Sequence, residues 1–485
     1  MFRSLLFVVL SVFIFTVPLA AQDDVTTQNA SSAAGGAFIT GPASNPLSFL
    51  NGPAYRTFGS VEPYDFRNFD PASLLNRHLP KWIGFGAEER LRYENNHDAN
   101  FKSGSDDGYS LNRFRYQMDL QPTNWLKIVS QVQDARPISE NPPIGPPNEN
   151  TWDLKLAYVQ AGDPEKQWFS VRAGRQLINY NNTIIANSEW RDQGRSYDAV
   201  AGNLHYRRYR LGLFAASAVI TRDFGISRHE KGNDVYGAYG YVNDVFSGAV
   251  LEPFVLWRTQ PSVALEAAAS RNGKQNERAY GVRLKGKAKG MLDYSAEAIA
   301  ERGSDGPNAI HAWASTIGVA YRFESLRGQP RLFTQYDFAA GDSHSTDGIH
   351  GTFDTMYPTA HDRFGITDQF GWQNISASRG GITVEPHHRW TLTAQYINFS
   401  LATASDGLYN TSGGLIVRDA TGRSGTHIGE ECDVYSWYEL NGHVNVGAGV
   451  GHLMPGSFLA HTTSGPNFNY SYFAVNFKDN GKNRF

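Results

Sequence analysis

Arginines at every second position are the feature of this 485-residue sequence that most directly suggests chemistry. Arg113 and Arg115 alternate with Phe114 and Tyr116, a spacing that places both guanidinium groups on one face of a β-strand. A guanidinium group binds a carboxylate through two parallel hydrogen bonds, and rings of such groups select anions in a pore. The same arginines could instead pair with carboxylates across strands and hold a wall in shape, so both interpretations stay open.

Carboxylates are interleaved with the basic residues on these polar faces. The basic residues are Arg90, Arg92, Arg113, Arg115, Arg172, Arg210, Arg283, Lys285, Lys287 and Arg389. The acidic residues are Glu88, Glu94, Asp119, Asp293, Glu297, Glu301 and Asp337. The whole chain has 44 Lys and Arg against 47 Asp and Glu, and it lacks the basic excess of a nucleic-acid binder. We therefore expect no nucleic-acid partner.

An enzyme built on the same scaffold would need a nucleophile or a metal site, and neither motif is present. The sequence has no Gly-x-Ser-x-Gly and no His-Glu-x-x-His pattern, and its single cysteine, Cys432, excludes a disulfide framework. The acidic stretch 342–347 lacks the spacing of an EF-hand. Candidate histidines in connecting segments are His344, His350, His361, His387 and His388. We expect no catalytic residue, no metal site and no cofactor, and we rank a barrel enzyme below a pore.

The elements that must position the charges are strands. From Trp82 onward, apolar and polar residues alternate in segments about 10 residues long, the length of a tilted strand that crosses a bilayer. Aromatic residues make up 13% of the chain, and many lie at segment ends, as in the aromatic girdles of membrane barrels. Some connections are short, whereas 341–378 and 402–425 are long. We predict an all-β, transmembrane antiparallel β-barrel of about 18 strands, the last at 470–477.

The N-terminal segment indicates export. Arg3 precedes an apolar stretch from Leu5 to Ala20, and small residues for cleavage follow at Ala20 and Ala21. No later stretch reaches the ~18 apolar residues of a spanning helix. We predict a signal peptide at 1–21, a flexible leader at 22–80 and the barrel at 81–485, located in the outer membrane of a Gram-negative bacterium.

The segment after the fifth expected strand carries the most distinctive motifs. It contains Gly174-Arg175-Gln176 and, further on, Trp190-Arg191-Asp192-Gln193-Gly194-Arg195-Ser196-Tyr197-Asp198. Other matching pieces are Gln133-Asp134-Ala135-Arg136, Ile428-Gly429-Glu430-Glu431-Cys432-Asp433 and the stretch from Gly451-His452 to Pro455-Gly456. Together these motifs resemble the alginate export family of outer-membrane barrels, and the resemblance covers most of the chain after Trp82.

The resemblance implies an 18-stranded barrel that passively exports an anionic, alginate-like polysaccharide through an arginine-rich constriction. The expected partners are that polysaccharide or an oligosaccharide, the outer-membrane lipid and periplasmic export proteins. An anion-selective or general uptake porin is the alternative, and an ion pair between Arg195 and Asp198 that fixes an inward loop is the structural reading of the motif. The pore residues that we predict are Arg175, Arg191, Arg195, Asp198, Arg136, Asp134, Arg113 and Arg115.

Overall fold

The structure is a computed structural model, and its described residues belong to one compact unit, 34–485. It describes residues 76, 78–139, 148–164, 167–180, 183–187, 189–222, 224–246, 248–265, 268–288, 291–359 and 361–479. The predicted signal peptide and nearly all of the predicted leader lie outside the described residues. Among the described residues, no helix has the length and apolar character that a membrane span requires.

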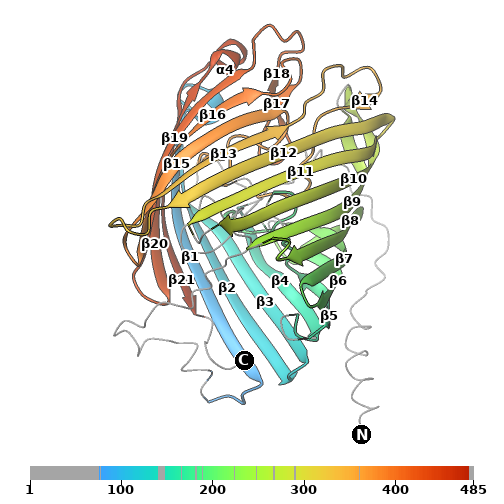
Figure 1. The fold of residues 1–485 in the computed structure, drawn as a ribbon, viewed down its shortest axis with the longest axis vertical. Coiled ribbons are helices and arrows are strands. Elements are labelled where there is room, and N and C mark those ends of the chain that lie inside the picture. Colours follow the sequence, from blue (N-terminus) through green and yellow to red (C-terminus); the bar gives the residue numbers. More distant parts are fainter. Residues whose placement is uncertain are drawn as a thin grey trace. The chain divides into compact units, whose positions relative to one another are not determined.

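The described chain forms one closed antiparallel β-barrel of 18 strands (Figure 1). Each barrel strand pairs with the next along the chain, and β1 pairs with β21 to close the wall. The barrel strands are β1 (Ile83–His97), β2 (Asp107–Thr123), β3 (Leu126–Ser139), β4 (Asn150–Ala161), β5 (Phe169–Gln176), β6 (Tyr197–Tyr206), β7 (Tyr209–Ile220), β8 (Arg228–Asn243), β9 (Ala249–Leu265), β10 (Ala268–Ala288), β11 (Leu292–Asp305), β12 (Asn308–Arg322), β13 (Arg331–Ala339), β15 (Ile375–His387), β16 (Trp390–Leu401), β19 (His427–Glu439), β20 (Val444–Pro455) and β21 (Phe468–Asp479). The predicted strand number is therefore confirmed.

The connections contain the remaining elements. These are η1 (Ala99–Phe101), α4 (Ser457–Thr462) and the short strands β14 (Ile349–His350), β17 (Gly407–Tyr409) and β18 (Leu415–Arg418). The strand β14 pairs with the start of β12, and β17 pairs with β18. At the other end of the barrel, connections such as the two residues between β6 and β7 are tight. Short turns face the periplasm in outer-membrane barrels and long loops face outside, which orients this one.

The alternation predicted from the sequence separates an outer face from an inner face. On β1, Leu91 and Tyr93 are 46% and 47% exposed, whereas Arg90 and Arg92 are 3% and 2% exposed. An apolar face open to the surroundings suits lipid, and the charged face is buried because it points into the barrel. Polar residues are thus on the inside, the reverse of a water-soluble sandwich.

Three connections from the loop-bearing end fill part of the interior. We call them the first inward segment (residues 177–196), the second inward segment (340–374) and the third inward segment (402–426). The second and third correspond to the long connections expected from the sequence. Their buried apolar side chains, among them Ile185, Phe364 and Leu408, join inward residues of the strands in one hydrophobic cluster. The interior of the barrel at this level is therefore a packed core rather than a simple water-filled tube.

Candidate functional site: the barrel lumen

The first inward segment is fastened to the wall by arginines of β1 and β2. Arg90 donates from Nη1 to the carbonyl oxygen of Glu189 at 2.8 Å and from Nη2 to that of Trp190 at 2.6 Å. Its Nη2 also forms an ion pair with Asp192 Oδ1 at 2.5 Å. Arg113 donates to the same Glu189 carbonyl oxygen at 3.0 Å. These contacts satisfy backbone carbonyls that would otherwise be buried without partners.

Arg115 completes this anchor through the side chain of Glu189. Arg115 forms an ion pair with the Glu189 carboxylate, and its Nε donates to Gln133 Oε1 at 2.7 Å. Lys155 Nζ donates to the carbonyl oxygen of Gln193 at 2.6 Å. Burial raises the pKa of Glu189, but Arg115, Lys155 and Arg113 outweigh that effect, so the pKa lies below its ordinary value. Arg113 and Arg115 thus point inward as expected, yet the segment covers them, leaving them 0% and 4% exposed.

Arg191 and Arg195 lie on the first inward segment itself. Arg191 is partly exposed, and its Nη2 donates to Thr411 Oγ1 of the third inward segment at 3.1 Å. Arg195 Nη1 donates to the carbonyl oxygen of Ala186 at 3.1 Å. Its guanidinium carbon lies 5.2 Å from the ring centroid of Tyr357, which belongs to the second inward segment. Both arginines therefore lie where inward segments meet.

Arg175 and Asp198 form a pair on the other side of the wall. Arg175 donates from Nε to Asp198 Oδ1 at 2.8 Å and from Nη2 to Oδ2 at 3.1 Å. Tyr197 is fully buried and packs edge-on against Tyr357 in the interior, so the next residue, Asp198, projects to the outer face. His229 Nδ1 lies 2.9 Å from Asp198 Oδ2. The motif thus divides between two faces, and Asp198 contacts Arg175 and His229.

Arg136 and Asp134 also lie on the outer face. They flank Ala135, which is fully buried on the inner side of β3. Their side chains form an ion pair at 2.8 Å between Arg136 Nε and Asp134 Oδ2, and Arg136 remains 48% exposed. The structure does not bring this pair together with Arg191 and Arg195.

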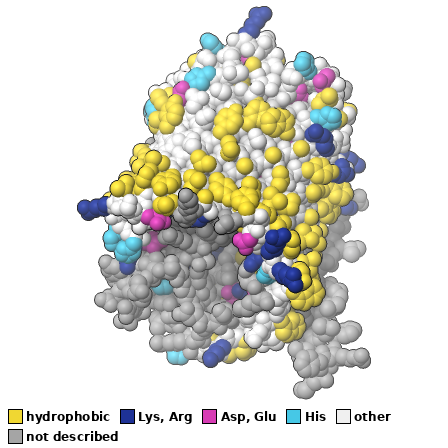
Figure 2. All heavy atoms as spheres, viewed as in Figure 1, with side chains coloured by type: hydrophobic (Ala, Val, Ile, Leu, Met, Phe, Trp, Pro, Cys, Tyr) yellow, Lys and Arg dark blue, Asp and Glu magenta, His cyan; other side chains and the backbone are white. Residues whose placement is uncertain are grey.

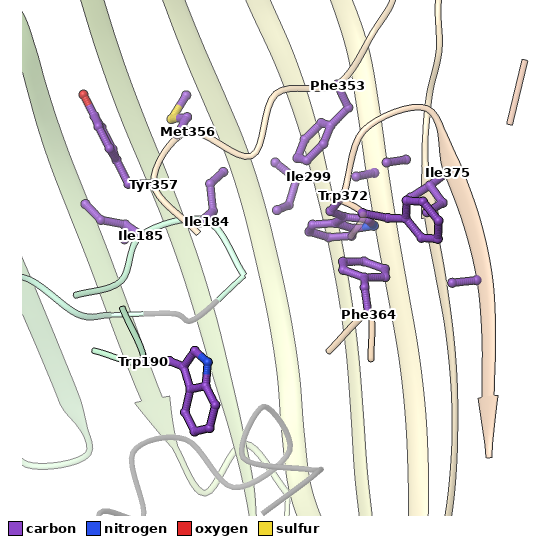
Figure 3. Packing of buried hydrophobic residues seen from close by; sticks show 14 of the residues in the cluster. Ile184, Ile185, Trp190, Ile299, Phe353, Met356, Tyr357, Phe364, Trp372 and Ile375 are labelled. Carbon is purple, nitrogen blue, oxygen red and sulfur yellow. The ribbon is translucent and has the colours of Figure 1, made fainter. Parts of the chain in front are cut away.

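The first and second inward segments run side by side across the interior, as Figure 3 shows for Ile184, Ile185 and Tyr357. The backbone amide of Ala186 donates to the carbonyl oxygen of Tyr357 at 2.8 Å, and the amide of Tyr357 donates to that of Ile184 at 3.0 Å. The indole of Trp190 stacks on the imidazole of His361, with ring centroids 3.9 Å apart. The segments are therefore joined to each other as well as to the wall.

The second inward segment has its own ion pairs to the wall. Asp354 pairs with Arg258 of β9, and Asp362 pairs with Arg379 of β15 at 3.0 Å. Burial raises the pKa of Asp354, but the adjacent Arg258 outweighs that effect, so the pKa lies below its ordinary value. Because buried charges are tolerated when paired, these contacts hold the segment inside the barrel. The sequence predicted a long connection here but gave no sign that it folds inward.

A second group of inward side chains lies toward the end with short turns and is not fully covered. Arg172 on β5, Arg210 on β7 and Lys285 on β10 are partly exposed. Arg172 donates from Nε and Nη2 to Gln160 Oε1, at 3.0 and 2.8 Å. Lys285 pairs with the buried carboxylate of Glu252. We call Arg172, Arg210 and Lys285 the periplasmic-side cations.

Aromatic rings cover the wall between these cations. Tyr180 is parallel to Phe214 and Tyr239 within 17°, with ring centroids 5.4 and 5.2 Å away. Phe214 and Tyr239 are buried beneath, whereas Tyr180 and Tyr241 are only partly buried. Our sequence analysis missed Tyr180 and Tyr241 as lumen residues. The sequence feature that corresponds to Tyr180 is Gly212 on the inner face of β7. In the structure, a Cβ at this position would collide with the ring of Tyr180.

The potential metal ligands lie apart from the lumen. Within the described ranges, one group of three has suitable spacing: His97 at the end of β1, with Asp98 and Asp106 in the connection that follows it. His97 Nδ1 lies 2.5 Å from Asp106 Oδ1, and both side chains are more than half exposed. The polar atoms of this exposed group already contact one another and the neighbouring backbone, and the group lies in a loop outside the lumen.

Comparisons with known proteins agree with this architecture. The sequence matches the family described as alginate export over residues 81–471. Two solved structures from Pseudomonas aeruginosa are similar: OccK2 (OpdF), with TM-score 0.56, 9% identity and coverage of 82% of this chain and 97% of that one, and OccK11 (OpdR), with 0.53, 11%, 82% and 95%. OccAB2 from Acinetobacter baumannii has TM-score 0.54 and 10% identity, covering 82% and 99%. No curated protein matches the sequence.

The structural likeness, at such low identity, establishes the barrel fold alone. The family match covers most of the barrel, including the inward segments and the motif residues Arg175, Arg191 and Arg195. Together with the apolar outer face and the charged interior, it identifies the chain as a member of the alginate export family of outer-membrane β-barrels.

Proposed function

We propose that this barrel is a passive pore that exports an anionic, alginate-like polysaccharide across the outer membrane. The observation that carries the proposal is the group of periplasmic-side cations next to the partly exposed rings of Tyr180 and Tyr241. Arg210 and Tyr241 are direct cross-strand partners, so a cation and an aromatic ring occupy adjacent positions on the inner wall. The family match supports a polysaccharide as the cargo.

A polyuronate suits this surface chemically. Each of its sugar units carries a carboxylate, which Arg172 or Arg210 can hold by charge-assisted hydrogen bonds. The apolar face of a sugar ring can pack on an exposed tyrosine, while the flexible chain moves from one position to the next. Because transport requires sites that are weak enough to leave, cations already engaged by neutral or acidic neighbours serve it better than free ones. Arg172 on Gln160 is such a case.

The first inward segment would form the narrower stage of the path. Arg191 is partly exposed at the junction with the third inward segment, and Arg195 lies behind it against Tyr357. In this proposal, Arg191 contacts the cargo and Arg195 positions the segment through the carbonyl oxygen of Ala186. Arg175 and Asp198 do not contact the cargo in this proposal. They brace β5 against β6 on the outer face.

The test is conductance of the purified full-length barrel in planar bilayers. We expect polyuronate oligomers added on the periplasmic side to block the current at lower concentration than neutral oligosaccharides of equal length. Replacing Arg172 and Arg210 together by Ala should raise the blocking concentration about tenfold, the effect of removing about 1.4 kcal/mol of binding free energy. Arg327→Ala, which removes an exposed cation from the β12–β13 turn, is the matched control.

Three results would contradict the proposal. Equal block by neutral and anionic oligomers would remove the case for a polyuronate cargo. Equal permeability to small anions and cations, unchanged in the double variant, would identify the lumen as a general uptake porin instead. Block that is stronger from the extracellular side would favour an anion-selective uptake pore over an exporter.

A further inference from the structure

Three basic residues occupy directly opposed positions on the outer face of the barrel wall. Arg278 of β10 is the cross-strand partner of Arg302 of β11, and Arg302 is the partner of His311 of β12. Their chain neighbours Glu277 and Glu301 are buried in the interior, so alternation directs these three outward. Arg302 and His311 are exposed and Arg278 is partly exposed. We call Arg278, Arg302 and His311 the outer-wall basic row.

Like charges placed directly opposite each other destabilise a sheet. Within the described ranges, no member of the outer-wall basic row forms an ion pair with a carboxylate. The guanidinium carbon of Arg278 lies 5.2 Å from the ring centroid of Trp257, its partner on β9, and Arg302 Nη1 donates to the backbone oxygen of Glu301 at 2.6 Å. Both contacts orient the arginines and leave their charges uncompensated. An anion from outside the chain would provide the missing compensation.

The position of the row indicates where that anion comes from. On β11 and β12 the outward residues from Leu292 and Tyr321 up to Ala300 and Trp313 are apolar except for Ser315, and the next outward pair is Arg302 and His311. The apolar stretch from 292 to 300 is about as long as a tilted strand needs to cross the hydrocarbon layer. The row therefore lies at the interface on the loop-bearing, extracellular side, where lipid headgroups begin.

Directly below the row, the outer wall is hollowed. A groove of about 700 Å³ runs over β7 to β12, and its lining is almost entirely apolar. Small side chains create the space: Ala238, Ala298 and Ala300 lie between the larger Val255, Val282 and Trp313. Figure 2 shows hydrophobic side chains gathered over this face, with basic side chains toward its margins. A groove that continues into a basic row combines the features that recognise an acyl chain and a phosphate.

We propose that the outer-wall basic row and the groove beneath it form a binding site for a phosphorylated, acylated glycolipid of the outer leaflet. The phosphate accepts hydrogen bonds from the guanidinium groups of Arg278 and Arg302, a pairing that arginine's planar fork favours. His311 adds a third donor at the end of the row. One acyl chain lies in the groove and packs against Ala298 and Ala300. This site is on the opposite face of the wall from the lumen and is independent of the cargo.

The experiment is native mass spectrometry of the full barrel in detergent, titrated with purified bis-phosphorylated lipid A. We expect the double variant Arg278→Ala, Arg302→Ala to bind at least tenfold more weakly. Dephosphorylated lipid A should bind the unaltered barrel as weakly as the phosphorylated lipid binds that variant. The matched control replaces Arg207 and Arg208, two exposed arginines of the β6–β7 turn, by Ala and should bind like the unaltered chain. Ala298→Phe, which fills the groove from the lipid-facing side, should weaken binding of lipid A whether or not the lipid is phosphorylated.

The outcomes separate the sources of phosphate. Competition by millimolar inorganic phosphate that abolishes lipid binding would overturn the lipid site in favour of a simple anion site. Equal affinity of the double variant, or an equal loss in the Arg207 and Arg208 control, would overturn the assignment to the basic row. Retention of the strand signal in circular dichroism shows that a variant is folded, and an unfolded double variant is replaced by Arg278→Gln, Arg302→Gln for the same comparison.

Discussion

The indole of Trp190 lies between the guanidinium group of Arg92, 4.1 Å from its ring, and the imidazole of His361, whose centroid is 3.9 Å away. Arg92 belongs to the wall, Trp190 to the first inward segment and His361 to the second. His361 Nδ1 in turn lies 2.9 Å from Asp368 Oδ2. This one ring therefore joins three parts of the interior that are far apart in sequence, in addition to the ion pairs that fasten each segment to the wall.

Replacing Trp190 by Ala should loosen the two inward segments without unfolding the wall. Removal of a buried indole costs about 3–5 kcal/mol in a core that does not relax. We expect more frequent current fluctuations and a larger mean conductance in planar bilayers. Trp190→Phe keeps a stacked ring and should behave nearly like the unaltered chain. A conductance trace for Trp190→Ala that matches Trp190→Phe would contradict this role.

Acid should weaken the anchor at Glu189. Its pKa in the folded chain is below the ordinary value of 4.5, so its contribution to stability is present above about pH 4.5. That contribution is lost as the pH falls through the lowered pKa, because the protonated carboxyl no longer pairs with Arg115 and Arg113. We expect protease sensitivity of the first inward segment to rise below pH 4.5. Glu189→Gln should show high sensitivity already at neutral pH and no further acid-dependent increase.

Removing Arg258 should destabilise the second inward segment strongly. This arginine pairs with Asp354 and, at 2.7 Å from Nη2 to Oε2, with Glu277. Arg258→Met leaves the buried carboxylate of Glu277 and the partly exposed carboxylate of Asp354 without this cation, and loss of one partner from a buried ion pair costs about 3–5 kcal/mol. The measurement is the midpoint of denaturant unfolding followed by tryptophan fluorescence. Adding Asp354→Asn and Glu277→Gln to Arg258→Met should restore part of the lost stability, and a failure of this rescue would argue against the charge explanation.

Gly212→Ala should weaken the block by polyuronate oligomers. A methyl group at this position would meet the ring of Tyr180 and push it off the stack with Phe214 and Tyr239. We expect the blocking concentration to rise several-fold with little change in unfolding, because the partly exposed ring contributes little to the core. Gly442→Ala, in the β19–β20 turn where the added methyl meets nothing within 4 Å, is the control. Unaltered block in Gly212→Ala would exclude Tyr180 from the path.

The sequence determined the barrel because the period of two along a strand encodes both environments at once. The apolar residues at 91 and 93 must face lipid and the arginines at 90 and 92 must face inward, whichever strands become neighbours. The strand number and the long connections follow from the same pattern, and both agree with the structure. Arg113 and Arg115 were assigned to the interior by this reasoning alone.

Only the tertiary structure decided what the motif residues contact. The stretch from Trp190 to Asp198 looks continuous in sequence, yet it crosses from an inward segment into β6, so Arg195 lies inside and Asp198 faces outward. Alternation gives no information about a connection that folds into the lumen, because some of its partners come from strands that are more than a hundred residues away. The inward course of the β5–β6 connection brings Glu189 to Arg90, and the packing of two inward segments brings Trp190 to His361.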